Sequence, residues 1–239
     1  MMHAKPCGNK IGSFDCCSVV CGDTFDLLPS LPSGCVHVVV TDPPFGVGIN
    51  GLEWDGRVPY ELLADMLRVA SGPVLWFGAA NRIGEAYKSF ATPPQRMLVW
   101  MPKFLLRAAI ENDVVHRYCP IYSWRLPNKR SRAADAHVWD VLHTHAERKS
   151  QHWWDHACTK PVKLMRKLVG FAPTGGVVLD PFAGSGSTLV AARDAGRHFL
   201  GFEIDAAHVE VCNARLAGEV PCDADKHLAS VPDATEAAA

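Results

Sequence analysis

Two short segments of the chain carry the residue types that could do chemistry. The first sets a carboxylate among rigid residues, in Asp42-Pro43-Pro44-Phe45. Consecutive prolines fix φ and remove backbone donors, so the turn is stiff and Asp42 is a well-placed hydrogen-bond acceptor. Phe45 offers a face on which a planar ring can stack. Asp-Pro also starts ordinary surface turns, so the tetrapeptide alone leaves both interpretations open.

The second segment is a glycine-rich loop, Asp180-Pro181-Phe182-Ala183-Gly184-Ser185-Gly186-Ser187-Thr188. Glycines let the backbone approach a ligand closely, and the start of the helix that follows offers N–H groups. The spacing is not that of a dinucleotide-binding loop, and no lysine follows as in a P-loop. The loop therefore predicts a ligand site of another kind, with a glycine turn that merely packs as the alternative.

Both segments follow buried apolar runs, which indicates the elements that position them. The pattern predicts strands at residues 35–40, 73–77, 97–101, 176–180 and 198–203, and helices at 60–70, 163–171, 187–196 and 206–216. Strands that alternate with helices imply a parallel sheet with helices on both faces, so the fold class is α/β. Residues 128–150 are polar and interrupt the rhythm, which indicates a loop-rich insertion.

Together the two segments resemble motifs of the DNA amino-methyltransferases. Thr41-Asp42-Pro43-Pro44-Phe45-Gly46 resembles the catalytic tetrapeptide in its setting, and residues 180–188 resemble the S-adenosylmethionine loop. The catalytic motif comes first, and this circularly permuted order is typical of the beta group. The resemblance spans residues 20–216 approximately, and Trp54-Asp55 matches a pair common in the family. It implies a permuted, Rossmann-like methyltransferase fold with a mixed, mostly parallel seven-stranded sheet.

The resemblance implies S-adenosyl-L-methionine as cofactor and assigns residues to it. The glycine loop would bind the methionine portion, and Glu203, within Gly201-Phe202-Glu203-Ile204-Asp205, would bind the ribose. His156-Ala157-Cys158-Thr159-Lys160-Pro161 resembles an element beside the methionine tail, matching it at the first and last two positions. The expected cofactor-binding residues are Asp23, Asp42, Lys160, Asp180, Phe182, Ala183, Gly184, Ser185, Gly186, Ser187, Thr188, Glu203 and Asp205.

The permuted order makes a prediction about the two ends of the chain. In the unpermuted sheet, the strand after Glu203 carries an acid that contacts the cofactor adenine. Here the chain nearly ends at that point, so this strand must come from residues 17–23, and Asp23 would lie near the adenine. Taken alone, a Gly-Asp after a strand is usually only a turn.

For catalysis, the resemblance implies that Asp42, Pro43, Pro44 and Phe45 act on an exocyclic base nitrogen. The lone pair of such an amine is delocalised into the ring. Acceptors aimed at its hydrogens, the Asp42 carboxylate and the Pro43 carbonyl, favour the geometry that frees the lone pair. Phe45 would stack the base, which must flip out of the duplex to arrive there. No Pro-Cys nucleophile is placed for methylation of a ring carbon.

A basic middle segment indicates a polyanionic partner, although the whole chain has a net charge of −1. Residues 96–167 carry 14 Lys and Arg against 6 acids, and the remainder is net acidic. In the family, target recognition lies between the catalytic and cofactor halves, which is the place of residues 125–150. The expected DNA-binding residues are Arg125, Lys129, Arg130, Arg132, Arg148 and Lys149.

Composition narrows the class of protein further. The 239 residues suit one methyltransferase domain over 11–217, with a disordered tail at 218–239. Neither a membrane-spanning run nor a signal peptide is visible, which predicts a cytoplasmic protein. The nine cysteines include no C-x2-C pair among Cys7, Cys16, Cys17 and Cys21, so reduced thiols and no metal are expected. His143 and His145 lack cysteine ligands nearby and are not expected to bind a metal either.

The sequence thus predicts an S-adenosylmethionine-dependent enzyme that methylates adenine N6 within a short sequence of double-stranded DNA. Cytosine-N4 methylation is the alternative, although that group more often has Ser in the place of Asp42. A DNA-binding module with decayed catalysis is a further alternative, which the intact Asp42, Glu203 and glycine loop argue against. An RNA substrate stays open. A homodimer and a cognate restriction endonuclease are candidate partners.

Overall fold

The computed structural model describes residues 8–46, 55–102, 110–111, 114–115, 118–126, 140–144 and 159–218. One eight-stranded sheet runs through this part of the chain, in the order β10-β6-β9-β5-β4-β11-β12-β3. Its strands are β3 (Ser18–Cys21), β4 (Val38–Thr41), β5 (Val74–Phe77), β6 (Arg96–Pro102), β9 (Cys119–Trp124), β10 (Val141–Thr144), β11 (Val177–Asp180) and β12 (His198–Glu203). Within this sheet only β9 runs antiparallel to its neighbours, β5 and β6.

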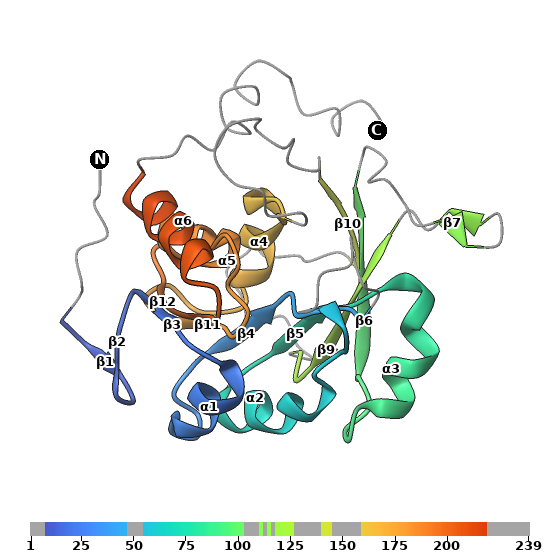
Figure 1. Ribbon diagram of the computed structural model, residues 1–239, viewed down its shortest axis with the longest axis horizontal. Helices are drawn as coiled ribbons and strands as arrows, with labels where there is room; N and C mark the ends of the chain where they lie inside the picture. Colours follow the sequence, from blue (N-terminus) through green and yellow to red (C-terminus); the bar gives the residue numbers. More distant parts are fainter. Residues whose placement is uncertain are drawn as a thin grey trace, which may run out of the picture.

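Helices cover both faces of the sheet, as the alternation of strands and helices predicts (Figure 1). One face carries α4 (Val162–Val169), α5 (Ser187–Asp194) and α6 (Ala206–Ala217); the other carries α1 (Thr24–Leu27), α2 (Leu63–Val69) and α3 (Ile83–Ser89). Alternation along β4 shows why the two layers form. Val38 and Val40 pack with α4 and α5, whereas Val39 packs with α2, and all three side chains are fully buried.

Short elements complete the described chain. Three of them are 3-10 helices that lead into or follow α-helices: η1 (Leu28–Ser30), η4 (Tyr60–Leu62) and η5 (Ala80–Arg82). Two are small hairpins, β1 (Lys10–Ile11) with β2 (Phe14–Asp15) and β7 (Ile110–Glu111) with β8 (Val114–Val115). Among the helices of the described residues, none is both long enough and apolar enough to span a bilayer.

The expected strands and helices are present to within a few residues at each end. The expected strand count of seven is wrong, because the sheet has eight strands. The additional strand, β10, comes from residues 128–150, which were expected to form a loop-rich insertion. Val141–Thr144 alternates exposed and buried side chains, and the strand adds to the sheet edge in parallel register with β6. Tertiary pairing therefore overrides the polar character of this segment.

The prediction for the N-terminal strand is confirmed. β3 lies parallel to β12, with Cys21 opposite Glu203, and the Gly22 N–H donates to the Glu203 carbonyl at 2.9 Å. Segments from opposite ends of the chain are thus neighbours at one edge of the sheet (Figure 1). This pairing places Asp23 beside Glu203.

Candidate active site

The centre of the sheet has the topology that creates a ligand crevice. β4 and β11 are adjacent and parallel, with Leu179 opposite Val39. From β4 the chain moves through α2 to β5 on one side, and from β11 it moves through α5 to β12 on the other side. Ligands of open α/β sheets bind where the connections diverge in this way, beyond the carboxyl ends of the strands. Asp42 and Asp180 lie at this point.

A row of acidic residues marks the same edge of the sheet. Four neighbouring parallel strands, β3, β12, β11 and β4, end at or just before an acidic residue: Asp23, Glu203, Asp180 and Asp42, in that order across the sheet. The chain order of these residues is different, so only the fold brings them together. The row presents carboxylates that can accept hydrogen bonds from hydroxyls and amines or attract a cation.

The Asp42 carboxylate is divided between a fixed oxygen and an available one. Its Oδ2 accepts from Nζ of Lys160 at 2.5 Å, and the side chains are 19% and 8% exposed. Lys160 Nζ also lies over the rings of Phe45 and Phe77, at 5.3 and 5.4 Å from their centroids. Oδ1 of Asp42 is buried and has no hydrogen-bond partner among the described residues. One oxygen is therefore held in place while the other can accept a hydrogen bond.

Asp55 fixes the turn that follows Asp42. Its Oδ1 accepts from the backbone N–H groups of Phe45 at 2.6 Å and Gly46 at 3.0 Å, and the residue is 1% exposed. Arg82 donates to the Gly46 carbonyl from the other side at 2.5 Å. The two prolines have no N–H to donate, so these contacts pin the remaining backbone groups of the turn. In the sequence Asp55 is only a family match, and its role as an anchor comes from the structure.

Phe45 borders a small hollow lined by aromatic side chains. Tyr60, Trp76, Phe77 and Tyr122 form its walls together with Phe45. The Tyr122 hydroxyl is buried without a hydrogen-bond partner among the described residues, and burial raises the pKa of Tyr122 well above its ordinary value. The expected stacking face of Phe45 is thus part of a larger aromatic surface.

Asp180 is a buried acid whose environment favours its neutral form. Burial raises its pKa to about 8, although hydrogen bonds from the Thr188 hydroxyl and the Phe182 backbone N–H act in the opposite direction. The Phe182 N–H lies 3.1 Å from Oδ1 of Asp180. The negative charge of Asp42 adds to the upward shift of the pKa. Near neutral pH Asp180 is therefore protonated, and it adds no second negative charge beside Asp42.

Glu203 is held ionised by the loop that it supports. Burial alone would raise its pKa, but contacts from His208 and from the N–H groups of Asp205 and Gly184 outweigh burial and lower it. Gly184 N donates to Oε2 at 2.7 Å, and Asp205 N donates to Oε1 at 2.9 Å. His208 Nδ1 lies 3.8 Å from Oε1, and Glu203 in turn raises the pKa of His208. The carboxylate thus ties the glycine loop to the end of β12.

Two features shape the glycine loop itself. Gly186 has φ of +82°, and a Cβ there would lie 2.3 Å from Sγ of Cys212, so only glycine fits. Arg215 of α6, which is 4% exposed, donates to the Ser185 carbonyl at 2.6 Å and to the hydroxyls of Ser185 and Ser187 at 3.0 and 3.2 Å. Arg215 lies 30 residues beyond Ser185, so no local sequence signal reveals this clamp.

Asp23 and Asp205 have structural duties in addition to the expected ones. Each is the N-cap of a helix: Asp23 accepts from Phe25 N at 2.9 Å, and Asp205 accepts from Ala207 N at 2.8 Å. Asp205 is exposed beside Glu203. Of the remaining loop residues, Phe182 and Ala183 precede α5 and Thr188 lies in its first turn. The strands and loops that carry the expected cofactor-binding residues thus end at the same edge of the sheet, and the role of these residues in cofactor binding stays a prediction.

The expected DNA-binding residues are placed only in part. Arg125 follows the antiparallel strand β9, so it lies at the opposite end of the sheet from Asp42, and its Nη1 donates to the Ala70 carbonyl at 2.6 Å. The expected role of Arg125 in DNA binding stays a prediction. The remaining candidates, Lys129, Arg130, Arg132, Arg148 and Lys149, lie outside the described residues, as do Trp54 and His156.

The observed residues fit the cofactor that the resemblance implies. S-adenosylmethionine combines a cationic sulfonium with ribose hydroxyls and an adenine. The ionised members of the acid row offer carboxylates to the cation and to the hydroxyls. Glu203 and Asp23 would face the ribose and adenine, and the loop would face the methionine portion.

Comparisons with known proteins agree with this site. A family model for DNA methylases of the N6/N4 type matches residues 101–214. The putative methylase YubD of Escherichia coli (strain K12) is 30% identical over 209 residues, which cover 82% of this chain and 88% of that protein.

Solved structures share the fold at lower identity. A putative DNA modification methylase from Thermus thermophilus, complexed with S-adenosyl-L-methionine, has a TM-score of 0.56 at 22% identity, covering 85% of this chain and 96% of that one. The cytosine-N4-specific PvuII DNA methyltransferase has a TM-score of 0.65 at 15% identity, covering 88% and 90% of the two chains. The chain therefore belongs to the DNA methylase family of the N6/N4 type.

Proposed function

We propose that the chain methylates the N6 amine of adenine within a short sequence of double-stranded DNA. The observation that carries this proposal is the divided carboxylate of Asp42. Oδ2 is fixed by Lys160, and the buried Oδ1 has no partner among the described residues. An oriented carboxylate oxygen accepts a hydrogen bond from an amine better than a serine hydroxyl does. Serine is commoner than aspartate at this position in the cytosine-N4 group.

The residues divide the work as follows. Asp42 Oδ1 and the Pro43 carbonyl accept the amine hydrogens and so favour the pyramidal nitrogen, while Pro44 and Asp55 hold the turn rigid. Phe45 stacks the flipped base. Bound S-adenosylmethionine supplies the methyl group on a sulfonium sulfur. Glu203, Asp23 and the loop clamped by Arg215 hold that cofactor, so the chain acts mainly by orienting the reacting atoms.

Product analysis tests the base. DNA methylated by the purified protein is hydrolysed to nucleosides, which are identified by mass spectrometry. N6-methyldeoxyadenosine is the expected product. N4-methyldeoxycytidine as the main product would contradict the choice of base and leave the family assignment intact, and methylated RNA in place of DNA would contradict the choice of substrate.

An Asp42→Ala variant tests the acceptor separately. Methyl transfer should be lost while calorimetric affinity for S-adenosylmethionine stays within a few-fold of the parent, because Oδ1 acts on the base. Methyl transfer at a rate close to that of the parent would contradict a catalytic role for Asp42. The recognition segment near residues 125–150, a homodimer, a restriction endonuclease partner and a cytoplasmic location stay predictions.

A further inference from the structure

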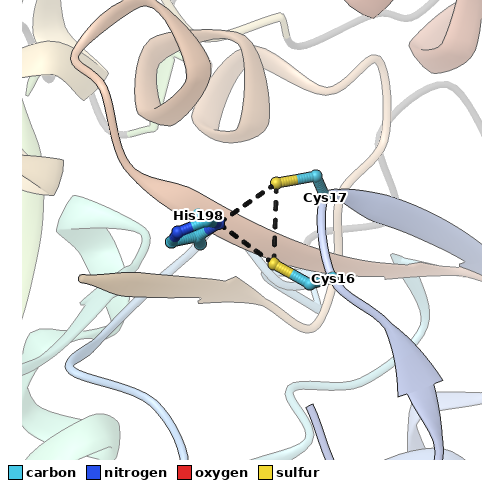
Figure 2. A group of neighbouring side chains, drawn as sticks. All are labelled: Cys16, Cys17 and His198. Carbon is cyan, nitrogen blue, oxygen red and sulfur yellow. Dashed lines mark hydrogen bonds between the residues drawn. The ribbon is translucent and has the colours of Figure 1, made fainter. Parts of the chain in front are cut away.

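A cluster of soft metal ligands lies at the far end of the sheet from the active site. Cys16 and Cys17 precede β3, and His198 begins β12 (Figure 2). Cys16 Sγ and Cys17 Sγ lie 3.2 and 3.6 Å from Nδ1 of His198, and the two sulfurs are 3.6 Å apart. The metal-ligating atoms of this cluster all fall within 4.8 Å of one another.

These separations are close to those of a tetrahedral zinc site. With zinc–sulfur bonds of about 2.3 Å and zinc–nitrogen bonds of about 2.0–2.1 Å, tetrahedral angles place two sulfurs ~3.8 Å apart and sulfur and nitrogen ~3.6 Å apart. Two of the three observed distances match to within about 0.2 Å, and the third needs a movement of roughly 0.4 Å. Two thiolates and one imidazole form a donor set that binds zinc in preference to hard cations such as Mg²⁺ or Ca²⁺.

The backbone brings both thiols to the same side, which a regular strand would not do. Successive side chains of a strand point to opposite faces. Cys17 has φ of +62°, a left-handed conformation that is uncommon outside glycine, and it breaks the alternation. Hydrogen bonds hold this geometry: Cys16 N donates to the Asn9 carbonyl at 3.0 Å, and Cys17 N donates to the Phe199 carbonyl at 2.8 Å.

A disulfide explains the pair of cysteines less well. Cα atoms joined by a trans peptide are about 3.8 Å apart, which is below the usual range of roughly 4.4–6.8 Å for disulfides. The arrangement also includes His198, which a disulfide would not need. A metal ion uses all three side chains.

We propose that Cys16, Cys17 and His198 bind one Zn²⁺, with water or one further protein group in the fourth position. Binding releases the protons of the thiols that become thiolates. The ion joins β3 to β12 at their amino ends, and Asp23 lies ~20 Å further along the chain, at about 3.3 Å per strand residue. The site is therefore a clip for the edge strand that completes the cofactor pocket, and it is remote from the transferred methyl group.

Metal analysis tests this proposal on the full-length, untagged protein. Zinc content is measured after equilibration with zinc and removal of the unbound ion, in the parent and in Cys16→Ser/Cys17→Ser, His198→Gln and Cys21→Ser. Cys21 is an exposed thiol at the end of β3, outside the cluster, so Cys21→Ser is the matched control. The parent and Cys21→Ser should hold about one zinc per chain, and the other variants should lose most of it.

Cobalt substitution of the parent reports the type of ligand without using a variant that could fold poorly. The parent loaded with Co²⁺ should show a thiolate-to-cobalt charge-transfer band and the visible absorption of a tetrahedral site. A chelator should remove the band and lower the unfolding temperature of the parent by several degrees.

Three results would overturn the proposal. They are a parent that takes up neither metal, a double cysteine variant that retains zinc as the parent does, and cobalt spectra without a thiolate band. None of these readouts depends on methyl transfer, so they are independent of the proposed base.

Discussion

Replacing Lys160 by methionine asks whether its ammonium serves Asp42 or the cofactor. The sequence places Lys160 among cofactor-binding residues, whereas the structure places Nζ 2.5 Å from Oδ2 of Asp42. Methionine keeps the length of the stem, so the space between Phe45 and Phe77 stays filled. The substitution therefore removes the charge and the hydrogen bond with little change in packing.

The size of the effect follows from one charged hydrogen bond in a largely buried place. Such a bond contributes about 1.5–3 kcal/mol, and every 1.4 kcal/mol is a factor of ten. If Lys160 orients Asp42, kcat should fall roughly 10- to 100-fold. The side chains are only 8% and 19% exposed, so stability should fall as well, towards the lower end of the ~3–5 kcal/mol cost of a broken buried pair.

Single-turnover methyl transfer and calorimetric cofactor affinity should be measured in parallel at saturating DNA. Lys163→Met on the exposed side of α4 is the control for loss of a lysine in the same segment. We expect Lys160→Met to slow transfer while cofactor affinity stays within a few-fold of the parent. Transfer within about twofold of the parent, or a loss of affinity as large as the loss of rate, would refute the positioning of Asp42 by Lys160.

Other parts of the site give further expectations. Asp23→Asn should retain the helix cap, whereas Asp23→Ala should lose about 1 kcal/mol of stability and roughly tenfold in cofactor affinity, and unchanged affinity would remove Asp23 from the site. Asp180 keeps a proton up to about pH 8 that the unfolded chain loses near its ordinary pKa of 3.8, so its contribution to stability declines as pH rises through that window. In denaturant unfolding, the free energy of unfolding of Asp180→Asn relative to that of the parent should therefore rise by up to ~1.4 kcal/mol for each unit that the pH rises. Parallel pH profiles of stability in the two proteins would contradict the raised pKa. Gly186→Ala should lower the unfolding temperature more than Gly218→Ala, since both have positive φ but only Gly186 has a side chain, Cys212, in the way. Equal losses would mean that Cys212 moves aside freely.

Much of the sheet follows from local pattern, and the misses have physical causes. Continuous apolar runs such as Val38–Thr41 predict buried strands because both faces of the sheet are covered. β9 was missed because Pro120 interrupts its run and a proline argues against an interior strand. β10 was missed because the surrounding polar residues mask a short strand that only its pairing with β6 stabilises.

The candidate site shows the same division between local and tertiary information. The glycine loop and the rigid turn at Asp42 could be recognised because their chemistry lies within a few consecutive residues. The partner of Asp42, Lys160, lies 118 residues away, and His198 lies 182 residues from Cys16. Such pairs come together only through the order of strands in the sheet, which residue spacing does not encode.

The pairing of β3 with β12 also determines when the edge strand β3 can pair during synthesis of the chain. β3 comes before the other strands of the eight-stranded sheet in the chain, yet its partner β12 is made about 180 residues later. Chains of this kind fold progressively during synthesis, and contacts between distant segments form late. The edge strand must therefore wait unpaired while the centre of the sheet assembles. A product truncated before β12 therefore lacks the edge of the sheet at which Asp23 and Glu203 become neighbours.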